Sequence, residues 1–258
     1  NVGTNGGSAY TRPSTAPGRS DTVLVTDYGY NAAGWVETIT DPKGIVGKAY
    51  YDNAGRTVKT IENYVNGTPS DADDKTTEFS YNGNNQMTSL TAKLTSGYQT
   101  TAWVYGTSAA AGDGVTSYDL LKETHWPNAS TGDANSADKE TRVVNALGQL
   151  KTYTDRNSNV HTLTYDVLGR LTVDAVTTLG TGVDGAVRRL EIGYDGQGNA
   201  SLFTSYDAAA GGNVVNQVQR EFNGLGQLTK EYQEHGGSVN TSTSPKVQYS
   251  YTEMASGA

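Results

Sequence analysis

The side chains best suited to chemistry in this sequence are three aspartates that recur in one short pattern, Asp52, Asp166 and Asp195. Paired carboxylates are the catalytic groups of most enzymes that hydrolyse glycosidic bonds. Each of these aspartates follows a tyrosine and lies three residues before a glycine. An aspartate in that position has a complete structural explanation, because its carboxylate bonds the backbone two residues further on in a turn. We therefore expect turn residues and a protein that is not an enzyme, with a glycosidase as the enzymatic alternative.

Histidines and acidic clusters are the candidates for a metal site. The histidines are His125, His161 and His235, and the acidic stretches are Asp71, Asp73 and Asp74, and Asp133, Asn135 and Asp138. The histidines have none of the short spacings that metal ligands use. The acidic stretches lack the glycine and the final glutamate of a calcium loop. We expect packed or exposed histidines, solvated acidic loops, and neither a metal nor a cofactor.

Aromatic residues are the third group with binding chemistry. The sequence has 17 Tyr but only 3 Phe and 3 Trp, a balance that favours thin layers in which rings are buried and hydroxyls reach the backbone or water. Rows of aromatic rings on a β-surface bind sugars, and Trp35, Trp103 and Trp126 are the candidate glycan contacts. Packing between hairpins is the competing and more common use of such rings.

Composition and charge exclude several classes of partner. The net charge is -8 and no cluster of Lys and Arg is present, so the sequence argues against nucleic acid as a partner. No stretch approaches the roughly 20 apolar residues of a membrane span. The absence of Cys excludes disulfides and thiolate metal sites. With 31 Gly and 18% charged residues, the chain is typical of many short strands joined by turns.

One pentapeptide pattern recurs along the chain: an aromatic residue, Asp or Asn, two variable residues, and Gly. The five copies are Tyr30-Asn31-Ala32-Ala33-Gly34, Tyr51-Asp52-Asn53-Ala54-Gly55, Tyr165-Asp166-Val167-Leu168-Gly169, Tyr194-Asp195-Gly196-Gln197-Gly198 and Phe222-Asn223-Gly224-Leu225-Gly226. Asp or Asn caps a turn, and Gly takes the left-handed conformation that closes a type I turn with a bulge. Because the flanking residues alternate between polar and apolar, each copy predicts a β-hairpin with one half-buried face.

Two looser copies and a set of intermediate turns complete the repeat. The looser copies are Val144-Asn145-Ala146-Leu147-Gly148 and Tyr81-Asn82-Gly83-Asn84-Asn85, where Asn replaces Gly at a position of positive φ. Second turns lie midway between motifs, at Asp41-Pro42-Lys43-Gly44 and at 155–159. Arg56 and Arg170 follow the motif glycine, and we expect them to pair with an Asp of a neighbouring repeat or to stack on Tyr, forming a ladder across the sheet.

The repeat predicts one architecture for most of the chain. A single hairpin is marginal in water, so the hairpins must stack side by side as a long continuous antiparallel sheet, spiral or solenoid-like, that is part of a cocoon or a filament. We expect an N-terminal extension or linker at 1–20, the hairpin array at 21–251 and a C-terminal tail at 252–258. Open sheet edges are an aggregation hazard, and together with the absence of an initial Met they favour a fragment of a longer protein.

The copies Tyr51-Asp52-Asn53-Ala54-Gly55-Arg56 and Tyr165-Asp166-Val167-Leu168-Gly169-Arg170, with the Asp41-Pro42-Lys43-Gly44 turn, resemble the YD repeats, also called RHS repeats. The resemblance covers roughly residues 21–251. It implies a β-sheet ribbon that spirals into a hollow shell, as in bacterial toxin complexes, RHS effectors and teneurins. The self-cleaving region and toxin domain of that family have no visible counterpart here, so neither activity is carried over.

Three functions remain open at this point. The first is a non-catalytic structural module of an extracellular or cell-surface bacterial protein that forms a segment of a shell, wall or fibre. The second is a carbohydrate-binding or adhesion module, and the third is the shell part of a toxin-delivery protein. The expected partners are other repeats of the same or a longer chain, copies that associate through sheet edges, and glycans.

Overall fold

The structure is a computed structural model that describes residues 14–15 and 18–251. These residues form seventeen β-strands and a single three-residue 3-10 helix, Ala109–Ala111, so the prediction of an all-β chain of antiparallel hairpins is confirmed. They divide into two compact units: unit 1 contains the described residues up to Trp103 with His125–Ser136, and unit 2 contains Val104–Thr124 and the described residues from Ala137 onward. The predicted tail, 252–258, and most of the predicted extension, 1–20, lie outside the described residues.

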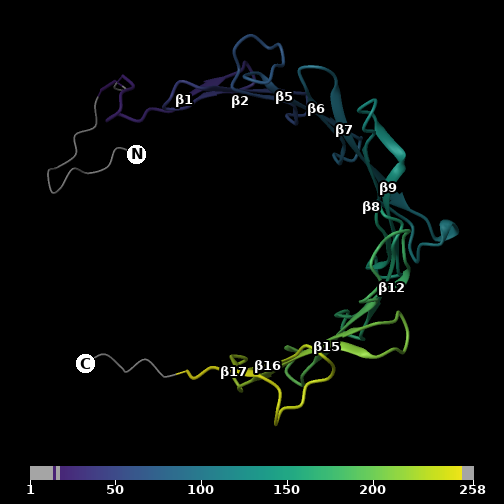
Figure 1. The fold of residues 1–258 in the computed structure, drawn as a ribbon. Helices are drawn as coiled ribbons and strands as arrows, with labels where there is room; N and C mark the ends of the chain where they lie inside the picture. Colours follow the sequence, from purple (N-terminus) through teal and green to yellow (C-terminus); the bar gives the residue numbers. More distant parts are fainter. Residues whose placement is uncertain (1–13, 16–17, 252–258) are drawn as a thin grey trace, which may run out of the picture. The chain divides into compact units, whose positions relative to one another are not determined.

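Unit 1 is built from strands that pair in chain order, each antiparallel to the next. They are β1 (Asp27–Tyr30), β2 (Val36–Thr40), β3 (Val46–Tyr51), β4 (Thr57–Glu62), β5 (Lys75–Tyr81), β6 (Met87–Lys93) and β7 (Tyr98–Thr107). Figure 1 shows them in chain order by colour. The turns after β1, β3 and β5 are the motif turns, so these turns occupy one rim of the sheet. The connections after β2, β4 and β6 occupy the opposite rim, which we call the loop rim.

Unit 2 follows the same plan. Its strands are β9 (Ala134–Val144), β10 (Leu150–Thr154), β11 (Val160–Tyr165), β12 (Leu171–Thr178), β13 (Arg189–Tyr194), β14 (Ala200–Tyr206), β15 (Val214–Phe222), β16 (Leu228–Glu234) and β17 (Lys246–Gln248), and they also pair in chain order. Strands β7, β9 and β8 (Ser117–Pro127) have residues in both units. The stretch 86–141, which lacks the motif, thus contributes four strands, three of them ten or eleven residues long.

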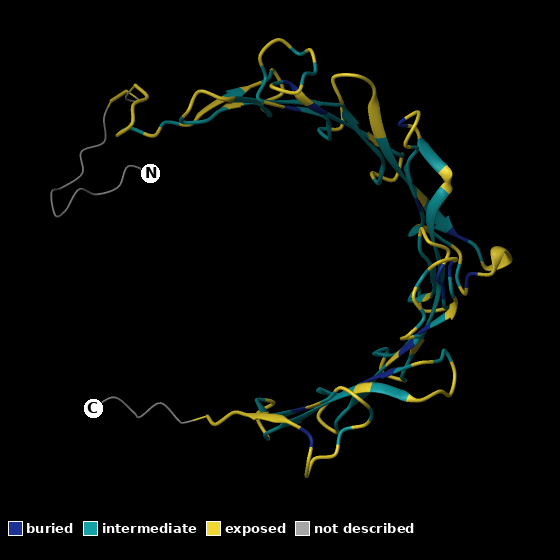
Figure 2. Ribbon diagram, in the orientation of Figure 1, coloured by how far each residue is buried: buried dark blue, intermediate teal, exposed yellow. Residues whose placement is uncertain are grey.

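Full burial is rare in both units, and most strand residues are half-buried (Figure 2). The buried apolar residues among those described are Ile61, Val144, Ala175 and Tyr232. A sheet without a second packed layer buries only the side chains that its own loops and neighbouring side chains cover. This explains the excess of tyrosine, since a half-buried ring keeps its hydroxyl within reach of backbone or water.

Long loops on the loop rim supply part of this cover in unit 2. Arg189 is buried on β13, and its guanidinium donates to the carbonyl oxygens of Ala208 at 3.0 Å and Gly211 at 2.9 Å. The same guanidinium lies 3.9 Å from the centre of the Tyr206 ring. The loop between β14 and β15 is therefore fixed to the sheet by a charged side chain whose hydrogen bonds offset its burial.

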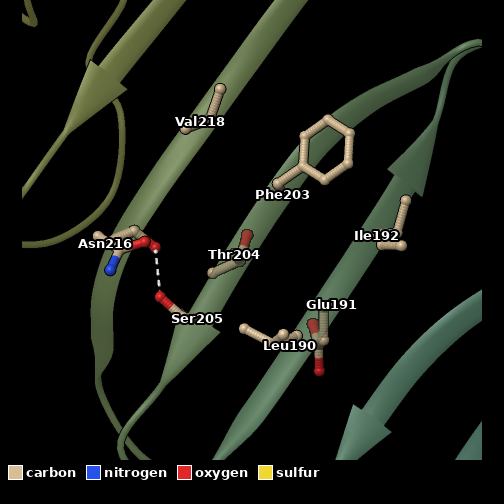
Figure 3. A pocket seen from close by; sticks show the side chains of 8 residues that line it. All are labelled: Leu190, Glu191, Ile192, Phe203, Thr204, Ser205, Asn216 and Val218. Carbon is tan, nitrogen blue, oxygen red and sulfur yellow. Dashed lines mark hydrogen bonds between the residues drawn. The ribbon is translucent and has the colours of Figure 1, made fainter. Parts of the chain in front are cut away.

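The other face of the same strands carries a shallow apolar hollow, which Figure 3 shows across β13, β14 and β15. The pairing places Ile192, Phe203 and Val218 side by side in one row, because paired residues point to the same face.

The described part of the chain contains no helix with the length and apolar character needed to cross a bilayer.

Candidate functional site

The repeated motif turn is the best-defined site in the molecule. In the turn that starts at Asp52, the Gly55 N–H donates to the Asp52 carbonyl at 3.0 Å, and the carboxylate accepts from the N–H groups of Ala54 at 2.9 Å and Arg56 at 3.0 Å. The same three bonds recur in each motif turn, with Asp or Asn as the acceptor. The recurring carboxylates thus satisfy backbone donors that a turn would otherwise leave open.

The last motif residue has positive φ throughout. The angle is +84° at Gly34, +80° at Gly55, +79° at Gly169, +91° at Gly198 and +74° at Gly226. The looser copies follow, with +76° at Gly148 and +63° at Asn85. Asn is among the few residues with a side chain that take this conformation readily.

The residue after the motif glycine completes the turn with a side chain chosen to match the capping residue. Where the cap is Asp, this residue is a donor; where the cap is Asn, it is a Gln whose carbonyl accepts, except after Asn31, where it is Trp35. Arg56 and Arg170 donate to Asp52 and Asp166, Asn199 donates to Asp195, and Asn82, Asn145 and Asn223 donate to Gln86, Gln149 and Gln227, all at 2.7–2.9 Å. We did not predict this complementarity, although cap and partner are always four residues apart.

The two arginines differ from the expectation in one respect. Each forms its ion pair with the Asp of its own turn, at 2.6 Å for Arg56 and 2.7 Å for Arg170, rather than with an Asp of a neighbouring repeat. The four-residue spacing brings the pair together within one turn, which explains the choice. The guanidinium then lies over the motif tyrosine of the next hairpin, 4.8 Å from the Tyr81 ring centre and 4.0 Å from the Tyr194 ring centre.

Motif tyrosines link consecutive hairpins through their hydroxyl groups. The hydroxyls of Tyr51, Tyr81, Tyr165 and Tyr194 donate at 2.6–2.9 Å to the carbonyls of Val36, Thr57, Leu150 and Leu171. Tyr251, which is outside the motif copies, makes the corresponding bond to the carbonyl of Leu228 at 2.8 Å. Each acceptor is the first residue of the outgoing strand of the preceding hairpin. Because donor and acceptor belong to different hairpins, this bond fixes the register between repeats. It could not be predicted without the pairing of the strands.

Phe222 occupies the motif position but has no hydroxyl to donate. In the other copies the acceptor is the first residue of the preceding outgoing strand, and the residue at that place here is Ala200, the first of β14. We expect Phe222→Tyr to stabilise the protein by about 1 kcal/mol, and Tyr165→Phe to destabilise it by about the same amount. Urea unfolding of the two variants checks both signs. Equal destabilisation by both changes would contradict the role of the hydroxyl.

A bulge follows every motif turn at the same place. In the hairpin of Tyr165, Leu171 pairs with Tyr165 and Val173 with Thr164, so Thr172 has no partner across the strands. The Thr172 hydroxyl donates to the carbonyl of Thr164 at 3.1 Å, and Thr229 and Ser201 make the corresponding bonds to Glu221 and Gly193. A hydroxyl at the bulge thus donates to a backbone carbonyl at the point where the regular hydrogen bonding between the two strands is interrupted.

Neighbouring turns also touch each other. Gln149 donates to the carbonyl of Gly169 at 3.0 Å, and the Trp35 ring lies against Gly55, where an added Cβ would be 3.0 Å from it. Gly55 is therefore favoured for two reasons, its positive φ and the Trp35 ring that passes over it. Trp35 also packs against Tyr51, with ring centres 5.3 Å apart.

The tryptophans considered as glycan contacts and the histidines considered as metal ligands lie on different strands and loops. Trp35, Trp103 and Trp126 are all half-buried, and the last two lie on β7 and β8. His125 lies on β8, exposed His235 begins the loop after β16, and the His161 Nδ1 lies 2.7 Å from the Asp174 carboxylate. Within the described ranges, no group of three or more His, Cys, Asp or Glu side chains is arranged to hold a metal ion.

The acidic stretches differ from the expected solvated loops. Asp74 is completely buried, and its carboxylate accepts from the N–H groups of Val65 and Asn66, both at 3.0 Å. Asp138 forms an ion pair with Arg156 at 2.6 Å. Asp133 stays exposed and accepts from the Tyr98 hydroxyl at 2.6 Å. Charge alone did not reveal these roles, because each partner is distant in sequence or belongs to the backbone.

The hydrogen bonds of the turns lower the pKa of their carboxyl groups. The Arg56 side chain is the main cause at Asp52, the Arg170 N–H at Asp166, and the Asn199 side chain at Asp195. A lowered pKa favours the ionised form in the folded state. At neutral pH these groups are therefore acceptors and lack the proton that a general acid must donate.

Acid should weaken the turns. A carboxyl whose pKa is lower in the folded state contributes stability above its unfolded-state pKa of about 4, and this contribution is lost as the pH falls through the folded-state pKa. We expect the urea midpoint to fall steeply between pH 4 and pH 2. The fall should be smaller in an Asp52→Asn/Asp166→Asn variant, whose amides do not titrate. An equal fall in both proteins would contradict the assignment.

The fold and this site define the chain as a tandem β-hairpin repeat protein whose motif side chains bind their own turn and the next hairpin. No protein-family model matches the chain, and no curated protein matches it. Solved structures similar to it include chains of the TcdB2-TccC3 complex (14% identity, TM-score 0.31, covering 88% of this chain and 15% of that chain), of TcdB2-TccC3-Cdc42 (13%, 0.30, 83% and 14%) and of the Photorhabdus luminescens Tc holotoxin pore (13%, 0.29, 83% and 14%). The chain thus spans about a seventh of the proteins it matches, and these identities and TM-scores are too low to transfer an activity or a partner.

Proposed function

We propose that this chain is a non-catalytic structural module of an exported bacterial protein, and that it forms a segment of a shell, wall or fibre. Its repeated side chains hold the hairpins in register, and the contribution of the chain is the sheet that these hairpins form. A shell that encloses the cargo of a toxin-delivery protein is the most specific form of this role.

One observation carries the proposal: the three aspartates considered as catalytic residues have their carboxylates hydrogen-bonded within their own turns. The Asp52 and Asp166 carboxylates each accept two backbone bonds and an arginine, and Asp195 accepts two backbone bonds and the Asn199 amide. A nucleophile or general base must instead be free to approach a substrate. A wall of repeats requires the arrangement seen here, in which each unit binds the next.

The mass of the native polypeptide and its assembly state in the electron microscope test this role. We expect a longer polypeptide or a multimer in which the hairpins line a shell, wall or fibre. A small monomeric protein that turns over a glycoside substrate would contradict the proposal. Loss of that turnover on Asp166→Asn would identify the turn carboxylates as catalytic.

A carbohydrate-binding or adhesion module is the second candidate, and edge strand β1 favours it. Tyr28 and Tyr30 are 55% and 63% exposed, and they lie two residues apart, so they point to the same face of the strand. Two exposed rings on one face form a short platform for sugar rings. By contrast, the tryptophans first considered for this role are half-buried.

Glycan-array binding tests the second candidate. We expect a Tyr28→Ala/Tyr30→Ala variant to lose at least tenfold in apparent affinity for any bound glycan. Tyr118→Ala is the matched control, because Tyr118 is an exposed tyrosine (77%) on another strand, β8. Absence of binding to every glycan, or equal loss in the control, would exclude β1 as a sugar platform.

A further inference from the structure

Three of the four consecutive motif turns of unit 2 present large apolar side chains at their outermost positions. The four turns span 145–149, 166–170, 195–199 and 223–227, and we call their two middle residues the tip row: Ala146, Leu147, Val167, Leu168, Gly196, Gln197, Gly224 and Leu225. Leu147 is 80% exposed, Val167 102%, Leu168 73% and Leu225 84%. Three of the four turns thus project an aliphatic side chain into water.

The turn itself does not require these side chains. The corresponding positions of the motif turns in unit 1 hold Ala32 and Ala33, Asn53 and Ala54, and Gly83 and Asn84. Those turns make the same backbone bonds to their Asp or Asn cap. An apolar tip is therefore a property of unit 2, and it has no internal packing partner to explain it. Clustered exposed apolar side chains are typical of interaction surfaces.

The tip row is held rigidly in register. Gln149 binds the carbonyl of Gly169, and Arg170 lies against Gly198, where an added Cβ would be 3.3 Å from its guanidinium. The sheet sets the spacing, because two strands per hairpin place successive tips roughly 10 Å apart.

Part of the backbone at the tips already has its hydrogen-bond partners within the turn. The N–H groups of Leu147, Leu168 and Leu225 donate to the caps of their own turns at 2.9–3.0 Å. The only charges in the turn of Val167 and Leu168 are Asp166 and Arg170, which form an ion pair. Covering these tips would therefore leave the N–H groups of the three leucines paired and no unbalanced charge in the turn of Val167 and Leu168.

We propose that the tip row packs against the tip row of a second copy of this chain. A sheet of the same repeat has the same spacing of roughly 10 Å, so the aliphatic tips of one copy can lie in the gaps between the aliphatic tips of the other. An unrelated surface has no reason to match this spacing. Four exposed side chains make a small contact, so a pair of rows should associate weakly, and larger assemblies would gain strength from many rows.

This surface deepens the proposed structural role by naming the contact through which sheets meet. It differs from association through the sheet edges, which uses strand backbone rather than turn tips. Gln197 marks the one turn without an aliphatic tip, and so offers a site where the contact can be strengthened as well as weakened.

Sedimentation equilibrium of the purified chain tests the proposal. We expect a weak dimer in the wild type, at least tenfold weaker association in a Leu147→Ser/Val167→Thr/Leu168→Ser/Leu225→Ser variant, and roughly threefold to tenfold stronger association in Gln197→Leu. Ala32→Ser/Ala33→Ser is the matched control in unit 1 and should associate like the wild type. All of these positions are exposed, so the variants should fold, and circular dichroism checks that they do.

Two results would overturn the proposal. The first is association that is unchanged in the four-residue variant, which would point to the sheet edges. The second is that the wild type and the Gln197→Leu variant are both monomeric. A monomeric wild type that instead floats with phosphatidylcholine vesicles through its tips would count as this second result. Neither result affects the structural role itself, which the mass and the assembly state of the native polypeptide test separately.

Discussion

Replacing Gly132 with alanine is expected to destabilise unit 1 by about 3–5 kcal/mol, the range of the largest single-residue effects. Gly132 has a φ of +78°, and a Cβ added there would overlap the carbonyl oxygen of Tyr98. The backbone cannot move away freely, because the Gly132 carbonyl accepts from the Thr100 N–H at 2.7 Å. Urea unfolding followed by tryptophan fluorescence measures the loss.

Gly97→Ala is the matched control for this change. Gly97 also has a positive φ, +94°, but nothing lies within 4 Å of an added Cβ. Its replacement should therefore cost only the conformational strain, about 1–2 kcal/mol. Equal losses in the two variants would show that close packing at Gly132 is unimportant and that conformation alone is limiting.

The second large effect is expected at Asp74. Its buried carboxylate accepts from the N–H groups of Val65 and Asn66, and removing it leaves these donors without their acceptor in a place that water does not reach. Burial acts to raise the pKa of this carboxyl, but the surrounding N–H donors together lower it. We expect Asp74→Ala to lower Tm by roughly 5–10 °C in a melting scan.

Two further variants separate the possible causes. Asp74→Asn keeps one oxygen acceptor and should lie between the wild type and Asp74→Ala. Asp71→Ala removes an exposed carboxylate of the same loop, which bonds the Thr95 hydroxyl at the surface, and should change Tm little. An equal effect of Asp71→Ala would mean that the loop responds to its net charge and not to the buried acceptor.

The sequence was sufficient to predict the hairpins because each motif turn is determined locally. The cap, the glycine and the partner four residues after the cap form nearly all of their bonds within five residues, so a pentapeptide pattern contains the necessary information. Asn85 illustrates this: its place in the pattern predicted a positive φ without a glycine, and its φ is +63°.

Interactions between hairpins could not be predicted in the same way. The Tyr51 hydroxyl reaches a carbonyl 15 residues away and the Tyr81 hydroxyl one 24 residues away, because the loops between the strands differ in length. The buried position of Asp74 likewise depends on a loop that folds back on itself. Such contacts follow from strand register and loop course, which periodicity does not determine. The exposed tips of unit 2 were visible only once burial was known.

The motif turns and the connections on the loop rim differ in how far their lengths vary. Every motif turn has five residues, whereas the connections on the loop rim range from four residues at 94–97 to twelve at 63–74. The connection between β7 and β8, which has no motif, has nine residues at 108–116. The repeats of this chain thus already carry connections of different lengths on the loop rim while the strands still pair in chain order. Foreign segments, such as epitopes or binding loops, should therefore be grafted between β12 and β13 or between β16 and β17, where the scaffold would display them side by side at intervals fixed by the hairpins.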